Sequence, residues 1–138
     1  AADVRVVADN ARLLSGFFRI GTHPGGGHMM LMAETASLDA ACAMSVFGEE
    51  IDGRRAQQLG LAWASLPDEQ VEDKAMAMAR YAAKDPDLAR TIVRTLRMTA
   101  GQKASQWSVA LQAERAAQIW AMRRVGRKRE AAAREGKA

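Results

Sequence analysis

The sequence is poor in cysteine, proline and aromatic residues, and these shortages exclude several classes of protein. Of its 138 residues, one is cysteine, three are proline and 5% are aromatic. The single cysteine, Cys42, cannot form an internal disulfide, and its apolar surroundings predict a buried thiol in a reducing compartment. No apolar run reaches the roughly 18 residues of a membrane span, and the first residues lack the basic and apolar regions of a signal peptide. We therefore expect a cytoplasmic protein with no membrane partner.

Excess positive charge is also scarce outside the C-terminal segment. The formal net charge is +4, but residues 123–138 hold seven Lys/Arg and two Asp/Glu, which leaves the preceding residues near −1. No aromatic residue alternates with these cations, as stacking on single-stranded nucleic acid requires. We therefore expect no nucleic-acid partner, and residues 126–138 are predicted to form a frayed helix or a disordered tail. Docking of this basic tail on nucleic acid or an anionic membrane is kept as an alternative.

Alanine and methionine are abundant, and their abundance indicates the fold class. Hydrophobic residues make up 49% of the chain and eight residues are methionine, which favours a core of closely packed helices. The fold class expected is mainly α with a few short strands. Periodicity predicts strands near residues 4–8 and 61–66, and helices over 28–33, 37–48, 52–60, 67–82, 85–101 and 105–124. The expected N-caps include Ser37, Asp52 and Asp85.

The last predicted helix carries an unusually wide apolar stripe, which suggests burial against more than one neighbour. We expect this stripe to be covered by another subunit or by a further part of the protein. Its central residues are Val109, Ala113, Ala116 and Trp120, and the residues that widen it are Trp107, Ala110, Ala117 and Ala121.

The stretch from Gly16 to Leu31 is the strongest local candidate for a site. Gly25, Gly26 and Gly27 remove every Cβ from a turn that precedes an expected helix start, so several backbone N–H groups can point in one direction. Such a turn can bind an anion, a water or a developing oxyanion. The alternative is that the glycines only let the chain pass close to another element, since neither a phosphate-loop Lys-Ser/Thr nor a complete GxGxxG accompanies them.

Other kinds of site have little support in the sequence. His23 and His28 are separated by a proline and three glycines, with no nearby cysteine or carboxylate to complete a metal site, so no metal is expected. Ser15 and Cys42 have no recognisable base partner, which argues against covalent catalysis. The methionines that follow the glycines either line an adaptable apolar pocket or belong to the core.

Three motifs arrive in an order that resembles the enoyl-CoA hydratase/isomerase (crotonase) family. They are D-x-R-x-x-A at Asp3 to Ala8, G-x-x-P-G-G-G at Gly21 to Gly27, and G-x-x-I-x-x-x-x-A-x-x-x-G-L from Gly48 to Leu61. The similarity runs through roughly the first 100 residues. It implies the C-terminal part of a crotonase-like α/β spiral fold together with its helical oligomerisation region.

The resemblance also implies how the chain is divided and what it binds. Residues 1–66 correspond to the end of the spiral core with the glycine turn, residues 67–125 to the helical C-terminal region, and residues 126–138 to the basic tail. The earlier part of the family pattern, with the adenine site, both oxyanion-hole amides and the first catalytic glutamate, has no counterpart here. The implied partners are an acyl-CoA and further copies of the chain in a trimer or hexamer.

Two residues of the glycine stretch correspond to functional positions of that family. Gly25 matches the position whose amide helps to hold the attacking water. Phe17 lies seven residues before Pro24, where the family has its second catalytic glutamate, and a phenyl ring can neither donate nor accept a proton. Arg127, Lys128 and Arg129 only loosely match the family's Phe-x-x-Lys-Arg pattern, which reaches the CoA of a neighbouring subunit.

The resemblance therefore implies a protein of fatty acid metabolism, of the lyase or isomerase type, that acts on an acyl-CoA thioester. The CoA thioester would be its substrate, and no cofactor is implied. Typical hydration by two glutamates is not expected with Phe17 in place, and this chain alone is expected to be inactive. The alternative is a non-catalytic acyl-CoA-binding or assembly protein of the same fold.

Overall fold

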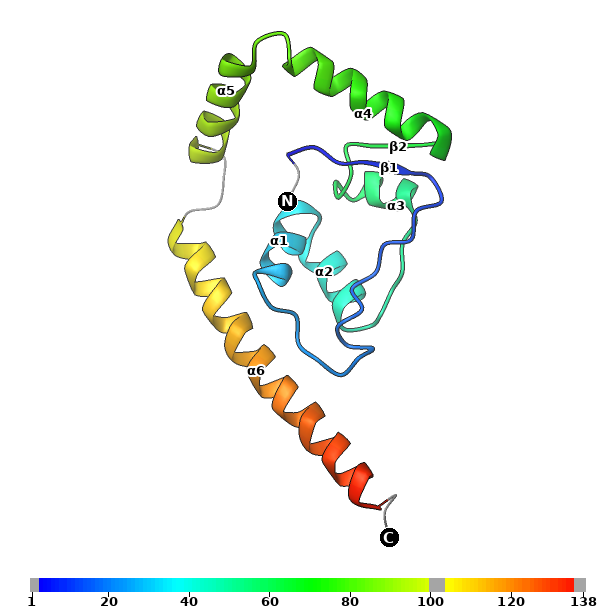
Figure 1. Cartoon of the computed structure of the whole chain (residues 1–138), viewed down its shortest axis with the longest axis vertical. Coiled ribbons are helices and arrows are strands. Elements are labelled where there is room, and N and C mark those ends of the chain that lie inside the picture. The colour runs from blue at the N-terminus through cyan, green and yellow to red at the C-terminus, as the bar shows by residue number, and fades with distance from the viewer. Residues whose placement is uncertain (1–2, 100–103, 136–138) are drawn as a thin grey trace. The chain divides into compact units, whose positions relative to one another are not determined.

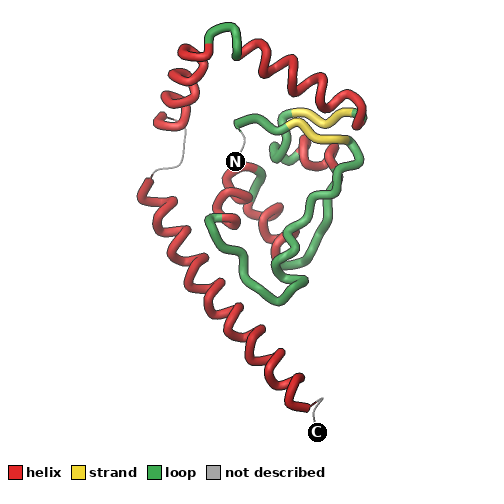
Figure 2. The backbone as a smooth tube through the Cα atoms, in the orientation of Figure 1, coloured by secondary structure: helices red, strands yellow, loops and turns green. Residues whose placement is uncertain are grey.

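The computed structural model describes residues 3–99 and 104–135, and the chain divides into two compact units. One unit holds residues 1–13 and 51–106, and the other holds residues 14–50 and 107–138. Each unit therefore combines two stretches that are distant in sequence. Helices dominate both, and the strands are three residues long (Figure 1, Figure 2). The predicted fold class, mainly α with a few short strands, is confirmed.

The first unit is organised around a pair of parallel strands. Strand β1 (Val6–Ala8) pairs with β2 (Ala64–Leu66), with Val7 opposite Ser65. Helix α3 (Gly53–Gln58) lies between them in the sequence and begins at a capping Asp52, whose carboxylate accepts from Arg55 N at 2.7 Å. Both strands and the helix were predicted, although β2 is shorter than the expected 61–66.

A small polar cluster joins these three elements. The Asp9 carboxylate accepts hydrogen bonds from Ser65 Oγ at 2.6 Å and from the Arg54 guanidinium at 3.1 Å. The Ser65 bond, followed by the Arg54 bond, lowers the pKa of Asp9 below its usual value. The backbone carbonyl of Asp9 also accepts from Gly53 N at 3.1 Å. A Cβ on Gly53 would lie 1.8 Å from the carbonyl oxygen of Ala8, so this close approach of α3 to β1 requires glycine.

Two further helices complete the first unit. Helix α4 (Asp68–Ala82) packs on β1 and β2, and helix α5 (Pro86–Thr99) follows it. The predicted cap is confirmed, because the Asp85 carboxylate accepts from Leu88 N at 2.9 Å and Pro86 occupies the first helical position. Arg97 of α5 donates to the Asp3 carboxylate at 2.6 Å. The predicted end of this helix at Gly101 lies outside the described residues.

The second unit contains two short helices and one long helix. Helices α1 (His28–Thr35) and α2 (Leu38–Ser45) pack against each other, and Ser37 caps α2 by accepting from Ala40 N at 3.0 Å, as predicted. The predicted burial of Cys42 is wrong, because its side chain is exposed. The face that α2 buries is rotated away from Cys42 and consists of Ala40, Ala41, Met44 and Ser45.

Helix α6 (Ala104–Glu135) is longer than predicted. Of the frayed helix and the disordered tail expected for residues 126–138, the disordered tail is wrong as far as Glu135, because the helix continues through Gly126. Alanine, arginine and glutamate are strong helix formers and supply most of residues 127–135, which offsets the cost of one glycine. No helix within residues 3–99 and 104–135 is both long enough and apolar enough to cross a membrane.

Helix α6 contacts its own unit through the residues that widen the apolar stripe. Ala121 is buried and Trp107, Ala110 and Ala117 are half-buried. Val109 and Trp120, in the centre of the stripe, are 70% and 59% exposed. Their predicted burial by another subunit or a further part of the protein stays a prediction.

Candidate functional site

The glycine turn lies in the second unit and leads directly into α1. Gly26 and Gly27 have φ angles of 76° and 81°, in the left-handed region where a side chain is strained. Gly27 is also the N-cap residue of α1, so the turn and the helix start are one continuous structure. Gly26 and Gly27 therefore permit the left-handed backbone conformation of this turn.

Helix α6 passes very close to two of these glycines. A Cβ on Gly27 would lie 2.3 Å from Cη2 of Trp107, and a Cβ on Gly25 would lie 2.3 Å from Oε1 of Gln118. A Cβ on Gly26 would meet nothing within 4 Å. The alternative reading of the turn, close passage of another element, is therefore confirmed for Gly25 and Gly27. This close passage does not exclude ligand binding at the turn, because the Gln118 carboxamide places a polar group beside Gly25.

The N-terminal amides of α1 are occupied by a carboxylate from α6. Glu114 Oε1 accepts from Met29 N at 2.8 Å and from Met30 N at 3.4 Å. Glu114 is only 6% exposed, and its Oε2 atom has no hydrogen-bond partner among the described residues. A negative charge at a helix N-terminus is stabilising, so α1 is capped internally. The amides of Met29 and Met30 are thus occupied, and the anion site predicted at this helix start stays a prediction for the turn that precedes Met29.

Sequence reasoning missed Glu114, although its position carried a signal. Residues Trp107, Ala110, Ala117 and Ala121 follow helical spacing, and Glu114 falls on the same face. A single acid within an apolar face must find a buried partner or remain in water. Here the partner is a helix N-terminus that lies 85 residues away in sequence.

A serine and a histidine also meet beside the glycine turn. A hydrogen bond of 3.0 Å joins Ser15 Oγ and His28 Nε2, and Ser15 is 5% exposed. The Phe17 ring lies 5.2 Å from the His28 ring, centroid to centroid, at an interplanar angle of 56°. The expectation that Ser15 has no base partner is therefore wrong, because the turn folds back over 13 residues to bring His28 against it.

The surroundings of His28 act on its pKa in opposite directions. Burial, the larger effect, lowers the pKa of His28 from its usual value of 6.5, and the Glu114 carboxylate raises it. The net lowering leaves the imidazole neutral at pH 7. A neutral imidazole can accept a proton, so this pair has the chemistry of a general base.

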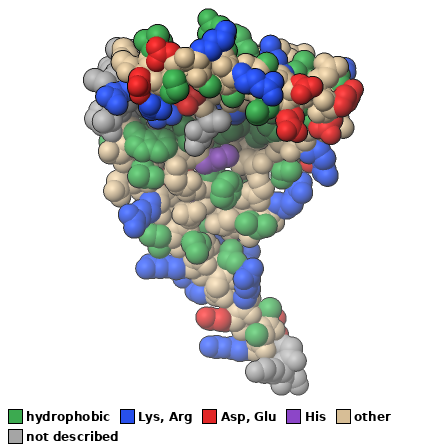
Figure 3. Space-filling view, turned by 45° about the horizontal axis from the view of Figure 1, so that its top comes forward, with side chains coloured by type: hydrophobic (Ala, Val, Ile, Leu, Met, Phe, Trp, Pro, Cys, Tyr) green, Lys and Arg blue, Asp and Glu red, His purple; other side chains and the backbone are tan. Residues whose placement is uncertain are grey.

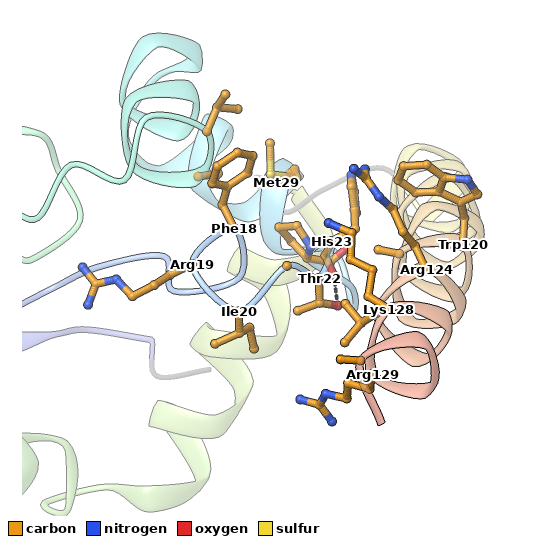
Figure 4. A pocket seen from close by; sticks show the side chains of 17 residues that line it. Phe18, Arg19, Ile20, Thr22, His23, Met29, Trp120, Arg124, Lys128 and Arg129 are labelled. Carbon is orange, nitrogen blue, oxygen red and sulfur yellow. Dashed lines mark hydrogen bonds between the residues drawn. The ribbon is translucent and has the colours of Figure 1, made fainter. Parts of the chain in front are cut away.

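A cavity of about 840 Å³ lies between the loop before the glycines and α6, within the second unit. Part of its wall is apolar and part is cationic, and Figure 4 shows side chains of both kinds around it. The Arg124 guanidinium lies over the Trp120 ring at 5.6 Å from its centroid. Lys and Arg side chains recur along the segment that ends at the C-terminus (Figure 3). The apolar lining residues include Phe18, Ile20, Met29, Val46 and Trp120, and the cationic ones are Arg19, Arg124, Lys128 and Arg129.

The two histidines have separate roles in this unit. His23 lines the cavity, and its Nδ1 donates to the carbonyl oxygen of Pro24 at 2.6 Å, so it stabilises its own turn. His28 begins α1, also as predicted. Among the residues that the structure describes, no group of three or more His, Cys, Asp or Glu side chains is arranged to hold a metal ion.

Comparisons with known proteins point to one family. The family profile for enoyl-CoA hydratase/isomerase matches residues 1–130. A probable enoyl-CoA hydratase of Rhodobacter capsulatus is 32% identical over 94 residues, which are 68% of this chain and 37% of the relative. The 1,2-epoxyphenylacetyl-CoA isomerase of Escherichia coli is 26% identical over 84 residues, which are 61% of this chain and 32% of the relative.

Solved structures show the same fold. The crystal structure of an enoyl-CoA hydratase from Mycobacterium smegmatis matches with a TM-score of 0.78 at 21% identity, over 88% of this chain and 55% of that one. An enoyl-CoA hydratase/isomerase from Pseudoalteromonas atlantica matches with a TM-score of 0.76 at 17% identity, over 88% and 47%. The chain spans about a third of the length of the curated relatives and about half of the length of these structures. With a family profile that covers nearly all of its length, the chain belongs to the enoyl-CoA hydratase/isomerase family.

Proposed function

We propose that this chain forms part of a binding site for an acyl-CoA thioester, on which the complete protein acts. The observation that carries the proposal is the cavity beside the glycine turn. Its apolar wall suits an acyl chain, and its four cationic side chains suit the phosphates of CoA. Gly25, which has no side chain to cover its backbone amide, is the proposed amide donor to the bound thioester or to a water beside it. The thioester is the substrate, and the proposal includes no cofactor.

The kind of chemistry depends on Phe17. With a phenyl ring at the position of a catalytic glutamate, hydration by two glutamates is not proposed for this site. A non-catalytic acyl-CoA-binding or assembly protein is the second candidate, and Phe17 is the observation that favours it. The exposed centre of the α6 stripe supports a homo-oligomer, a trimer or hexamer by the family resemblance. A cytoplasmic location is supported by the single unpaired cysteine.

Binding is tested by calorimetry on the complete gene product that contains these residues. Butanoyl-CoA is expected to bind saturably, and removal of two cavity cations in the variant Arg124→Ala/Lys128→Ala should weaken binding about tenfold or more. Arg134→Ala is the matched control, because Arg134 belongs to the same helix and does not line the cavity. Absence of any heat of binding in the native protein would refute the proposal.

The two candidate functions are separated by restoring the carboxylate. The native protein is expected to hydrate crotonyl-CoA poorly, and Phe17→Glu should raise that rate, because a carboxylate returns to the acid/base position. Phe47→Glu serves as the control, since Phe47 is 76% exposed and lies outside the glycine stretch. Loss of the enoyl absorbance measures the rate. Rapid hydration by the native protein would contradict the non-catalytic candidate.

A further inference from the structure

We propose that Trp120 positions the guanidinium group of Arg124, and that this guanidinium contacts a phosphate of the bound CoA thioester. The inference rests on the proposed function, because it requires a CoA thioester in the cavity. It gives an exposed tryptophan of α6 a role in binding that does not depend on contact between its ring and the ligand. Trp120 is thus a positioning residue, and Arg124 is the residue that contacts the anion.

The two side chains lie together because of their spacing on α6. Arg124 follows Trp120 by four residues, about one helical turn, so both project from the same side of the helix. The Arg124 guanidinium lies 5.6 Å from the centroid of the Trp120 ring. A cation at this distance over an indole ring is attracted by the negative charge of the ring face. Both side chains also line the cavity (Figure 4).

The contact with the ring prepares Arg124 to bind an anion. A guanidinium that lies over an aromatic ring still presents N–H donors along its edge, and two of them can bind one phosphate. A long side chain that moves freely before binding loses rotamer freedom when it binds, and this loss opposes binding. The ring restrains Arg124 beforehand, so less freedom is lost when the phosphate arrives.

The charge of the cavity wall also favours an anion. Four Lys or Arg side chains line the cavity, and its lining includes no Asp or Glu. The ion pairs within residues 3–99 and 104–135 involve none of these four cations. No carboxylate of the wall therefore balances its positive charge, and the phosphates of a CoA thioester would do so.

A ring contact distinguishes Arg124 from the other cations of the cavity. In the part of the chain that the structure describes, Arg124 forms a cation–π contact, whereas Arg19, Lys128 and Arg129 form none. Removal of the Trp120 ring should therefore affect binding through Arg124 and not through Lys128. Trp120 is 59% exposed, so its replacement removes little buried packing.

The test is a double-mutant cycle, in which calorimetry measures butanoyl-CoA binding to the complete gene product. Trp120→Ala is expected to weaken binding about threefold, the size of an exposed cation–π contact, and Arg124→Ala about fivefold. In the Arg124→Ala background, Trp120→Ala should weaken binding by less than about 1.5-fold, because no guanidinium remains to be positioned. Val109→Ala is the matched control, since Val109 is a 70% exposed residue of the same helix that does not line the cavity.

Two further comparisons show whether the ring acts through Arg124. In the Lys128→Ala background, Trp120→Ala should keep its full threefold effect, because Lys128 has no ring contact to lose. Trp120→Phe keeps an aromatic ring and should recover most of the affinity. A purely structural role for Trp120 would instead give equal losses in the Arg124→Ala and Lys128→Ala backgrounds.

A change of ligand tests whether the ring contacts the acyl chain instead. Free CoA has the phosphates of butanoyl-CoA but no acyl chain, so Trp120→Ala should weaken the binding of both ligands by the same factor. A loss that is confined to butanoyl-CoA would show that Trp120 contacts the acyl chain directly, and would overturn the positioning role.

The outcomes separate this inference from the proposed function. Absence of butanoyl-CoA binding by the native protein overturns both. Binding that Trp120→Ala leaves unchanged, or independent effects of Trp120→Ala and Arg124→Ala, overturns the positioning role and leaves the binding proposal intact. Circular dichroism checks that the variants fold. If Trp120→Ala does not fold, Trp120→Leu takes its place in the cycle, because leucine keeps apolar bulk without a ring.

Discussion

Replacing Gly53 with alanine is expected to lower the free energy of unfolding by about 3 kcal/mol, near the upper end for overpacking. The new Cβ would lie 1.8 Å from the carbonyl oxygen of Ala8 and 3.0 Å from Ser65 Oγ. The Ala8 oxygen belongs to the backbone of a paired strand, so it cannot yield as the tip of a flexible side chain would. Helix α3 must move away from β1, and the bond from Gly53 N to the Asp9 carbonyl is then lost.

Chemical denaturation followed by circular dichroism measures this effect, with Gly126→Ala as the control. Gly126 lies inside α6 and its added Cβ would meet nothing within 4 Å. That substitution is expected to stabilise by about 0.5–1 kcal/mol, since alanine is favoured over glycine in a helix interior. Equal effects of the two substitutions would show that the contact between Gly53 and Ala8 is not tight.

Replacing Glu114 with alanine is expected to lower the free energy of unfolding by about 2 kcal/mol, the size of a buried hydrogen bond to a charged group. The substitution leaves Met29 N and Met30 N without their acceptor and removes the negative charge at the start of α1. Glu114→Gln keeps an acceptor oxygen without the charge and should lose about half as much.

The same denaturation experiment tests this prediction, and Glu130→Ala is the matched control. Glu130 lies on the same helix with an exposed side chain, so its replacement should change stability by no more than about 0.5 kcal/mol. If Glu114→Ala and Glu130→Ala behaved alike, the carboxylate of Glu114 would not be capping α1.

Local signals account for the parts of the fold that were predictable from the sequence. Ser37, Asp52 and Asp85 each bond to a backbone N–H three residues ahead. Such capping depends on neighbouring residues alone, and these helix starts were predicted correctly. The family was also recognisable, because its glycine motifs determine the backbone conformation of short segments and can be identified from a few adjacent residues.

The unpredicted features depend on contacts between distant residues. The bond between Ser15 and His28 spans 13 residues and the cap provided by Glu114 spans 85. The acid on an apolar helix face was a signal for Glu114, but no local pattern identifies the partner of either residue. The exposure of Cys42 has the same origin, because the face that α2 buries is chosen by its tertiary neighbours. The roles of Gly25 and Phe17 stay predictions, since they concern a ligand rather than the chain's own packing.

The large separation in sequence between Glu114 and the helix that it caps has a consequence for synthesis on the ribosome. The carboxylate that caps α1 is added 85 residues after Met29, which corresponds to roughly 4–17 s at about 5–20 residues per second. During that interval α1 and the glycine turn emerge without their cap and without α6 against Gly25 and Gly27. Maturation of this turn is therefore a late event in the nascent chain, and termination before Glu114 would release a polypeptide that lacks the cap.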